Sequence, residues 1–322
     1  MTLISKQFLY CIPLILFKGI NYQKPIGLIY HLVSDEIVPH TQYIIKTKSI
    51  KQFKKDLDYI LKYYEPVDMT DISHNRTIKK DKVFFTFDDG YREVYEFVVP
   101  IFEAKGINAG IFMPTDFIDN RNLGHRNKIS LIIYTVKQDK DKARIISDYL
   151  NLKEKGLNPL VHKILQFGYK DQAQINKLAE LIDIDFDEYL IKKKPYLTKE
   201  QLNVLQEKGF YIGAHSIDHP YYQDLSSKEQ IIQTLQSVNY FRENFNNTID
   251  IFALPFSNRN IERDFYDKIK EEVDIVLGTE GLGKNNEIDN LIERVEMENG
   301  LNADISLKKE YLKLLYIKLI QS

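Results

Sequence analysis

Two segments of this 322-residue sequence carry side chains that could bind a cation and activate a water molecule. In the first, Asp88 and Asp89 stand together in the segment 86–90 (TFDDG), directly after a strongly apolar run. Adjacent carboxylates at the end of a buried strand favour a positive partner, because a buried negative charge is costly when nothing neutralises it. One of the two could bind a cation while the other faces the reacting water. The alternative is an aspartate that caps a helix starting near Tyr91.

The second segment, 215–219 (HSIDH), holds two histidines four positions apart, His215 and His219. Residues at this spacing lie on one face if the segment turns helically, and two neutral imidazoles placed in this way are known to bind zinc. Together with one carboxylate they would form a three-ligand site that leaves positions open for water and substrate. The alternative is one histidine in the core and one on the surface.

The elements that must position these groups alternate between strands and helices. We predict strands at 26–31, 83–87, 107–113, 210–214, 249–256 and 274–279. We predict helices at about 50–64, 91–105, 198–208, 227–241, 263–273 and 306–320. This alternation indicates a mostly parallel sheet, either open or closed into a barrel, with reactive groups at the carboxyl ends of the strands. His31, Asp88 and His215 each stand at or just after the end of a predicted strand.

The stretch from about 119 to 196 differs from the rest of the chain, because it is lysine-rich and has helical patches but few strand signals. We interpret it as a helical insertion. The predicted organisation is an apolar N-terminal segment at 1–24 and a single barrel domain at 25–322 that contains this insertion.

The combination of TFDDG and HSIDH resembles the polysaccharide deacetylases, carbohydrate esterase family 4, which share the NodB homology domain. The segments 28–31 (LIYH), 114–118 (PTDFI) and 253–256 (ALPF) resemble further motifs of this family. The resemblance extends from about residue 25 to residue 295. It implies a distorted (β/α) barrel, and it implies metal-dependent removal of N-acetyl groups from a glycan or glycan precursor.

The resemblance also implies roles for individual residues. Asp88 would be the general base, and the metal ligands would be Asp89, His215 and His219. The backbone N–H of Phe256 would help to bind the oxyanion that forms during hydrolysis. Pro255 and Phe256, which belong to the third motif, would contact the substrate. Independently of the resemblance, Tyr91 is an aromatic residue near the site on which a sugar could stack; the alternative is a tyrosine of the core.

Two positions depart from the pattern of the family. Ala253 stands where many members have an arginine that braces the base, and Arg294 would take over that role, as in one bacterial branch; the alternative is a surface ion pair with a neighbouring glutamate. The usual motif for the general acid is not evident, and His31 could supply the proton instead. The alternative for His31 is a structural histidine bonded to the backbone.

Zinc suits two imidazoles and a carboxylate, although cobalt, nickel or manganese could occupy an open site of this kind. Two other functions stay open at this point. One is a non-catalytic, glycan-binding barrel, and the other is a metal-dependent O-acetyl esterase or amidase on the same fold.

The composition of the chain limits the kinds of molecule that it could bind. The 44 basic and 46 acidic residues give a formal net charge of −2, which provides no electrostatic case for nucleic-acid binding. A single cysteine excludes an internal disulfide framework. The apolar segment 8–17 is too short to span a membrane and lacks a cleavage pattern, so it either packs on the domain or associates peripherally with a membrane. We expect a cytoplasmic protein, with export or membrane association as the alternative.

Overall fold

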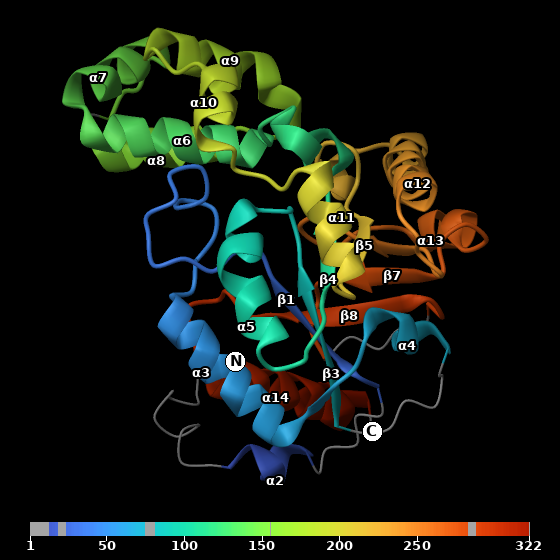
Figure 1. The fold of residues 1–322 in the computed structure, drawn as a ribbon. Coiled ribbons are helices and arrows are strands. Elements are labelled where there is room, and N and C mark those ends of the chain that lie inside the picture. Colours follow the sequence, from blue (N-terminus) through green and yellow to red (C-terminus); the bar gives the residue numbers. More distant parts are fainter. Residues whose placement is uncertain (1–12, 19–23, 75–80, 155, 283–287, 322) are drawn as a thin grey trace.

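The computed structural model describes residues 13–18, 24–74, 81–154, 156–282 and 288–321. Its centre is a parallel sheet that closes on itself, because the first strand pairs both with β3 and with β8 (Figure 1). The strands of this ring are β1 (Ile26–Tyr30), β3 (Lys82–Phe87), β4 (Gly110–Met113), β5 (Tyr211–Ala214), β6 (Ile251–Ala253), β7 (Ile275–Gly278) and β8 (Leu291–Glu296). A short strand, β2 (Glu65–Pro66), pairs with the start of β3. The predicted distorted barrel is confirmed.

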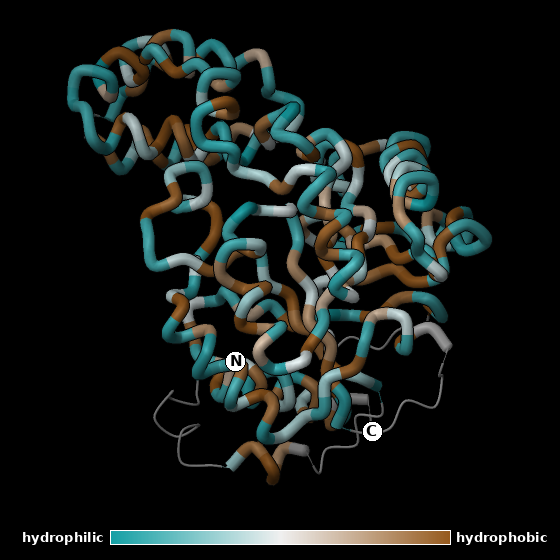
Figure 2. Tube along the Cα trace, viewed as in Figure 1, coloured by the Kyte–Doolittle hydropathy of each residue, from teal (hydrophilic) through white to brown (hydrophobic). Residues whose placement is uncertain are grey.

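Most strands of the ring are apolar because helices cover the outside of the barrel and side chains fill the inside. Strand β8 differs, since it carries Glu293, Arg294 and Glu296. Figure 2 shows hydrophobic colour concentrated on the central strands. Two strands are shorter in the structure than predicted. Of the range 107–113 only Gly110–Met113 forms strand β4, and of the range 249–256 only Ile251–Ala253 forms strand β6. Their flanking apolar residues, such as Ile107 and Leu254, are nevertheless buried. Burial therefore extends beyond the ends of the two strands.

The covering helices are α3 (Ile50–Tyr63), α4 (Met69–His74), α5 (Val99–Glu103), α11 (Lys199–Glu207), α12 (Ser227–Asn244), α13 (Arg263–Ile269) and α14 (Ala303–Gln321). Capping side chains stabilise the first turns of several of them. Ser49 accepts a hydrogen bond at the start of α3, and Thr198 forms a capping box with Gln201 at the start of α11. The helix predicted at 91–105 instead contains a π-helical turn, Val94–Val98, before α5, whose Pro100 has no backbone N–H to donate.

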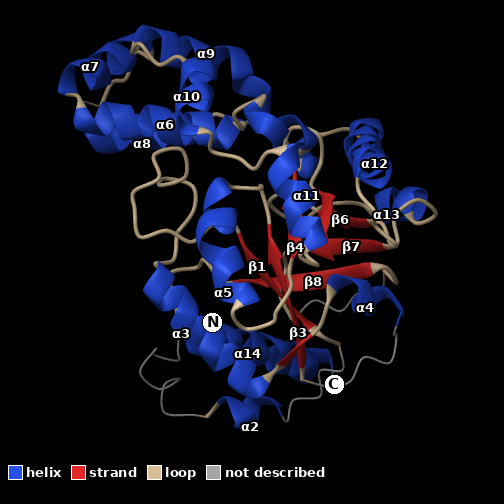
Figure 3. Ribbon diagram, viewed as in Figure 1, coloured by secondary structure: helices blue, strands red, loops and turns tan. Residues whose placement is uncertain are grey.

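Between β4 and α11 the described residues form five α-helices that stand at one end of the molecule (Figures 1 and 3). They are α6 (His125–Gln138), α7 (Lys140–Tyr149), α8 (Leu157–Leu165), α9 (Gln172–Leu181) and α10 (Phe186–Lys193). All lie within the stretch for which we predicted a helical insertion. They enclose an apolar cluster separate from the main core, with Ile132, Ile146 and Leu160 fully buried.

At the opposite end, the short helix α2 (Leu14–Lys18) packs against α14 (Figure 1). Within the predicted apolar segment 8–17, residues 8–12 lie outside the described residues. Leu14 and Phe17 are buried in the main core, whereas Ile15 and Leu16 are exposed. No helix in the described ranges combines the length and the hydropathy needed to cross a membrane.

Candidate active site

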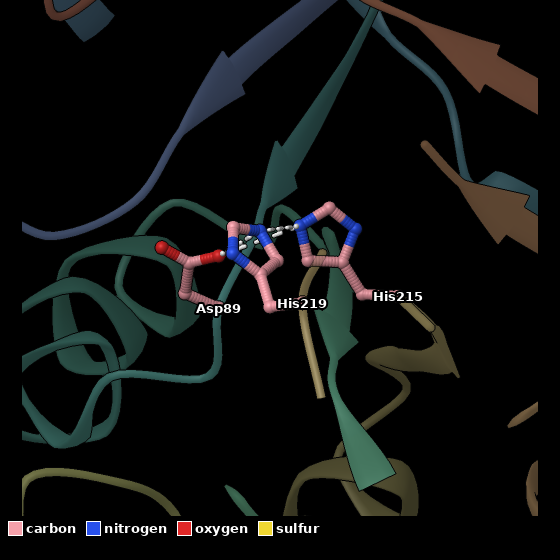
Figure 4. Close-up of side chains that lie close together, drawn as sticks. All are labelled: Asp89, His215 and His219. Carbon is pink, nitrogen blue, oxygen red and sulfur yellow. Dashed lines mark hydrogen bonds and ion pairs between the residues drawn. The ribbon is translucent and has the colours of Figure 1, made fainter. Parts of the chain in front are cut away.

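Three potential metal ligands converge at the carboxyl ends of β3 and β5. Oδ1 of Asp89 lies 3.1 Å from Nε2 of His219 and 3.4 Å from Nε2 of His215, and the two Nε2 atoms are 3.1 Å apart. Figure 4 shows the three side chains pointing toward one another. The structure therefore brings together the three residues that the sequence analysis named as ligands.

These side chains meet because the backbone turns in unusual ways. Asp89 has a φ of 69°, Ser216 a φ of 70° and His219 a φ of 62°, in the left-handed region that residues with a Cβ seldom adopt. The segment 215–219 is thus not the helical turn we considered but an irregular one. Oγ of Ser216 accepts a hydrogen bond from the backbone N–H of His219 at 3.0 Å, which holds the turn. Such local strain persists where the surrounding structure determines it, often at functional sites.

The three side chains fit a divalent cation. Nδ1 of His215 lies 2.7 Å from the carbonyl oxygen of Ala253, so Nδ1 donates its proton there and Nε2 keeps its lone pair. Oδ1 of Asp89 is buried and accepts no hydrogen bond from the described residues, although both imidazole nitrogens lie close to it. Two nitrogens and one oxygen that face a common point form a donor set suited to zinc and similar ions.

The protonation states agree with this assignment. Burial opposes a charge on Asp89, but His219 and His215 hold the pKa of its carboxyl well below the ordinary value. Burial also lowers the pKa of His219, which favours the neutral imidazole that a metal requires.

Asp88 forms a buried pair with Arg294 beside these ligands. Nη1 and Nη2 of Arg294 donate to Oδ1 and Oδ2 of Asp88 at 2.8 and 2.9 Å, and Nη1 also donates to Oγ1 of Thr86 at 2.9 Å. The arginine side chain has no exposed surface, so the alternative of a surface ion pair is wrong. Arg294 fits in the barrel because Gly27 faces it: a Cβ there would lie 2.7 Å from its Cγ. Oδ2 of Asp88 lies 3.9 Å from Nε2 of His215.

His31 stands at the end of β1 and contacts Glu298, a residue that the sequence analysis missed. Oε2 of Glu298 lies 2.6 Å from Nδ1 of His31 and accepts the backbone N–H of His31 at 2.8 Å. Oε1 accepts the N–H of Leu32 at 3.1 Å. Burial works against a charged imidazole, but Glu298 outweighs it and raises the pKa of His31 to about 10. The signal that could have indicated Glu298 is its place just after β8, at the same end of the barrel as the other groups.

A cavity of about 560 Å³ joins these groups. The predicted site residues that line it are His31, Asp88, Asp89, Tyr91, His215, His219 and Phe256. Phe256 stacks on Tyr221 with ring centroids 3.7 Å apart. Pro255 and Arg294 are buried and do not line the cavity. Tyr91 is only 1% exposed and its hydroxyl accepts from Asn127, so it offers little surface on which a sugar could stack.

The helical insertion reaches the cavity through Arg126 and Asn127, which stand in the first turn of α6. His125 of the same turn packs edge-on against Phe256 at 5.8 Å. Sequence analysis did not select Arg126, because a single basic residue in a lysine-rich stretch has no distinguishing local pattern.

The insertion also holds the turn that carries the candidate ligands His215 and His219. The hydroxyl of Tyr169 donates to Oδ2 of Asp218 at 2.6 Å, and Nε2 of Gln233 on α12 donates to Oδ1 at 2.8 Å. Asp218 lies between His215 and His219 in the sequence, so the turn is fixed from the insertion on one side and from the barrel on the other.

Comparisons with known proteins agree with this geometry. The sequence profile of the family described as polysaccharide deacetylase matches residues 75–269, more than half of the chain. The matched range contains Asp88, Asp89, His215 and His219, whereas His31 lies before it. No curated protein matches the sequence.

Several solved structures share the fold at low sequence identity. The structure of IcaB from Ammonifex degensii is similar with a TM-score of 0.55 and 13% identity, covering 91% of this chain and 98% of the other. The structure of the Streptococcus pyogenes deacetylase PplD in complex with acetate is similar with a TM-score of 0.56 and 14% identity. The match covers 90% of this chain and 98% of the other. The structure of the putative polysaccharide deacetylase BA0330 from Bacillus anthracis is similar with a TM-score of 0.55 and 11% identity. The match covers 90% of this chain and 69% of the other. The match to the family profile, on a barrel of the same architecture, shows that this chain belongs to the polysaccharide deacetylase family.

Proposed function

We propose that this protein is a metal-dependent hydrolase that removes N-acetyl groups from a glycan or glycan precursor. Membership of the family supports deacetylation of a glycan. The observation that carries the finer proposal is the convergence of Asp89, His215 and His219 beside a carboxylate held by a buried arginine.

A divalent ion bound by these three ligands would polarise the acetyl carbonyl and lower the pKa of a bound water molecule. Asp88 lies next to the ligands and would accept the proton of the attacking water. Arg294 binds both carboxylate oxygens and so fixes the orientation of this base. Because Arg294 is itself buried and also donates to Thr86 and to the carbonyl oxygen of Gly278, the position of Asp88 is fixed before substrate binds.

Phe256 would contribute the backbone donor for the oxyanion. Its φ of 56° turns the peptide out of the strand geometry at the cavity wall, and its N–H finds no acceptor among the described residues. A free, rigidly placed N–H is the kind of donor that stabilises a developing negative charge.

His31 would protonate the departing amine nitrogen. It lines the same cavity, and the contact with Glu298 keeps its imidazole protonated at neutral pH. A general acid must carry its proton before the bond to the leaving group breaks. His31 and Asp88 therefore have complementary roles, as acid and base, on two neighbouring strands.

The test measures acetate release from N-acetylglucosamine oligosaccharides together with metal content by elemental analysis. We expect about one metal per chain, loss of acetate release after chelation, and recovery with zinc, cobalt, nickel or manganese. An O-acetylated oligosaccharide of the same length serves as the comparison substrate. Faster release from the ester, or release that persists in the metal-free protein, would contradict the proposal.

A further inference from the structure

The two helices at the end of the molecule away from the insertion expose an unusual number of large apolar side chains. We call these residues the terminal apolar face: Ile15, Leu16, Leu315, Tyr316 and Leu319. Leu16 is 68% exposed and Leu319 67%, although both stand on helices that are anchored in the core by their other side. Helices α2 and α14 contact each other, and Figure 2 shows hydrophobic colour on part of α2.

The two terminal segments that carry this face are one-sided in charge. Residues 1–24 and 311–322 contain five lysines and no aspartate or glutamate, although acidic residues outnumber basic ones in the whole chain. Of these lysines, Lys24 and Lys313 are exposed in the structure. Glu310, which pairs with Lys313, is the last acidic residue of the chain. A surface with this composition is complementary to a negatively charged partner.

We infer that the terminal apolar face binds the surface of a bilayer that contains anionic lipids. Apolar side chains next to lysines, on short helices, are typical of segments that lie in the headgroup region, where burial of apolar surface and attraction to anionic lipids both contribute. A tyrosine, Tyr316, stands among the exposed residues, and tyrosine is enriched at this depth.

This placement orients the enzyme. The candidate active site lies at the carboxyl ends of the strands, under the insertion, whereas α2 and the C-terminal half of α14 lie at the opposite end of the barrel (Figure 1). A molecule bound through the terminal apolar face would hold its cavity away from the bilayer. It would therefore reach glycan that extends from the membrane surface rather than the lipid headgroups beneath it.

The first experiment is cosedimentation of the purified full chain with vesicles, either phosphatidylcholine alone or phosphatidylcholine with about 30% phosphatidylglycerol. We expect binding to the anionic vesicles that weakens as salt is raised. The double variant Leu16→Glu/Leu319→Glu should bind at least about tenfold more weakly, since each leucine loses its apolar burial. Ile191→Glu is the matched control, because Ile191 is 73% exposed on α10 and should not affect binding.

A second measurement does not depend on introducing charge. The chain contains no tryptophan, so Leu319→Trp provides a unique fluorophore on this face and Ile191→Trp provides one on the insertion. We expect a blue shift with anionic vesicles, and quenching by brominated lipid, only for Leu319→Trp.

Three results would overturn the inference: no sedimentation with anionic vesicles, equal binding by the double variant, or an unshifted Leu319→Trp spectrum. A dimer in sedimentation equilibrium that Leu16→Glu/Leu319→Glu dissociates, without vesicle binding, would assign the face to a second copy instead. Acetate release by the soluble variants should equal that of the unmodified chain. Failure of membrane binding therefore leaves the proposed function untouched.

Discussion

The contact between His31 and Glu298 allows a quantitative test of the proposed general acid. Glu298→Gln keeps the shape of the side chain and one acceptor but removes the negative charge that holds a proton on His31. In the unmodified protein the pKa of His31 is about 10, because the attraction of Glu298 outweighs burial. Without that charge the pKa should fall toward its ordinary value of about 6.5, since burial is then opposed only by the weaker attraction of Asp89 and Asp88.

The size of the effect follows from the fraction of His31 that is protonated. At pH 8 nearly all of the imidazole carries a proton when its pKa is about 10, whereas only about 3% does when its pKa is about 6.5. Because the pKa of His31 is raised, its imidazole is protonated at pH values below that pKa and loses the proton as the pH rises through it. Glu298→Gln should therefore lower kcat/KM about 30-fold at pH 8 but less than twofold at pH 6.

The assay is acetate release from an N-acetylated oligosaccharide between pH 5.5 and 10, with metal content measured in parallel. His31→Ala is the control, and it should lower activity at every pH. Two results would show that His31 is not the proton donor. One is a fall of kcat/KM at high pH that occurs at the same pH in Glu298→Gln as in the unmodified protein, and the other is a loss of activity that is equal at pH 6 and pH 8. A loss of metal in Glu298→Gln would also contradict the reasoning, because neither residue belongs to the ligand set.

The other predictions concern the ligands, the base and the insertion. Asp88→Asn should lower kcat about 10²–10⁴-fold with metal content unchanged, and retained turnover in the acetate assay would refute the general base. His215→Ala should lose metal and activity together, as elemental analysis and acetate release would show; a variant with a full metal complement would exclude this ligand. Arg294→Ala should lower turnover and destabilise the fold by about 3 kcal/mol in urea denaturation, because Asp88 is left buried without its partner. If stability alone falls, Arg294 does not orient the base. Arg126→Ala should raise KM several-fold for long oligosaccharides while kcat stays constant, and an equal KM would mean that the insertion does not contact substrate.

Much of the site could be predicted because its groups follow buried strands. Asp88, Asp89 and His215 each come directly after an apolar run, and parallel strands bring such positions to one end of a barrel. Arg294 was found through its resemblance to a family motif, since nothing in its local pattern distinguishes a buried arginine from an exposed one. Its burial depends on the absence of a side chain at Gly27, which is distant in the sequence.

Other features could not be derived from the sequence. Glu298 contacts His31 across 267 positions, and no spacing rule links two residues so far apart. The left-handed residues at 216 and 219 replace the helical turn that we considered for the two histidines, because contacts of Asp218 and Ser216 decide the backbone there. Tyr91 was expected on the substrate side, but its ring packs against Tyr196 of the segment that returns from the insertion. Tertiary contacts override local preference at each of these positions.

The hydrogen bonds of Asp218 have a consequence for cooperativity. Tyr169 belongs to a unit with its own apolar core, and Gln233 to a helix that packs on the barrel, so the ligand-bearing turn is part of two folding units at once. Regions of a protein open with different free energies, and a segment shared by two units is ordered only while both are closed. The amide protons of this turn should therefore exchange at the rate set by the less stable unit. A partial opening of the insertion would therefore disorder the candidate metal ligands before the barrel begins to unfold.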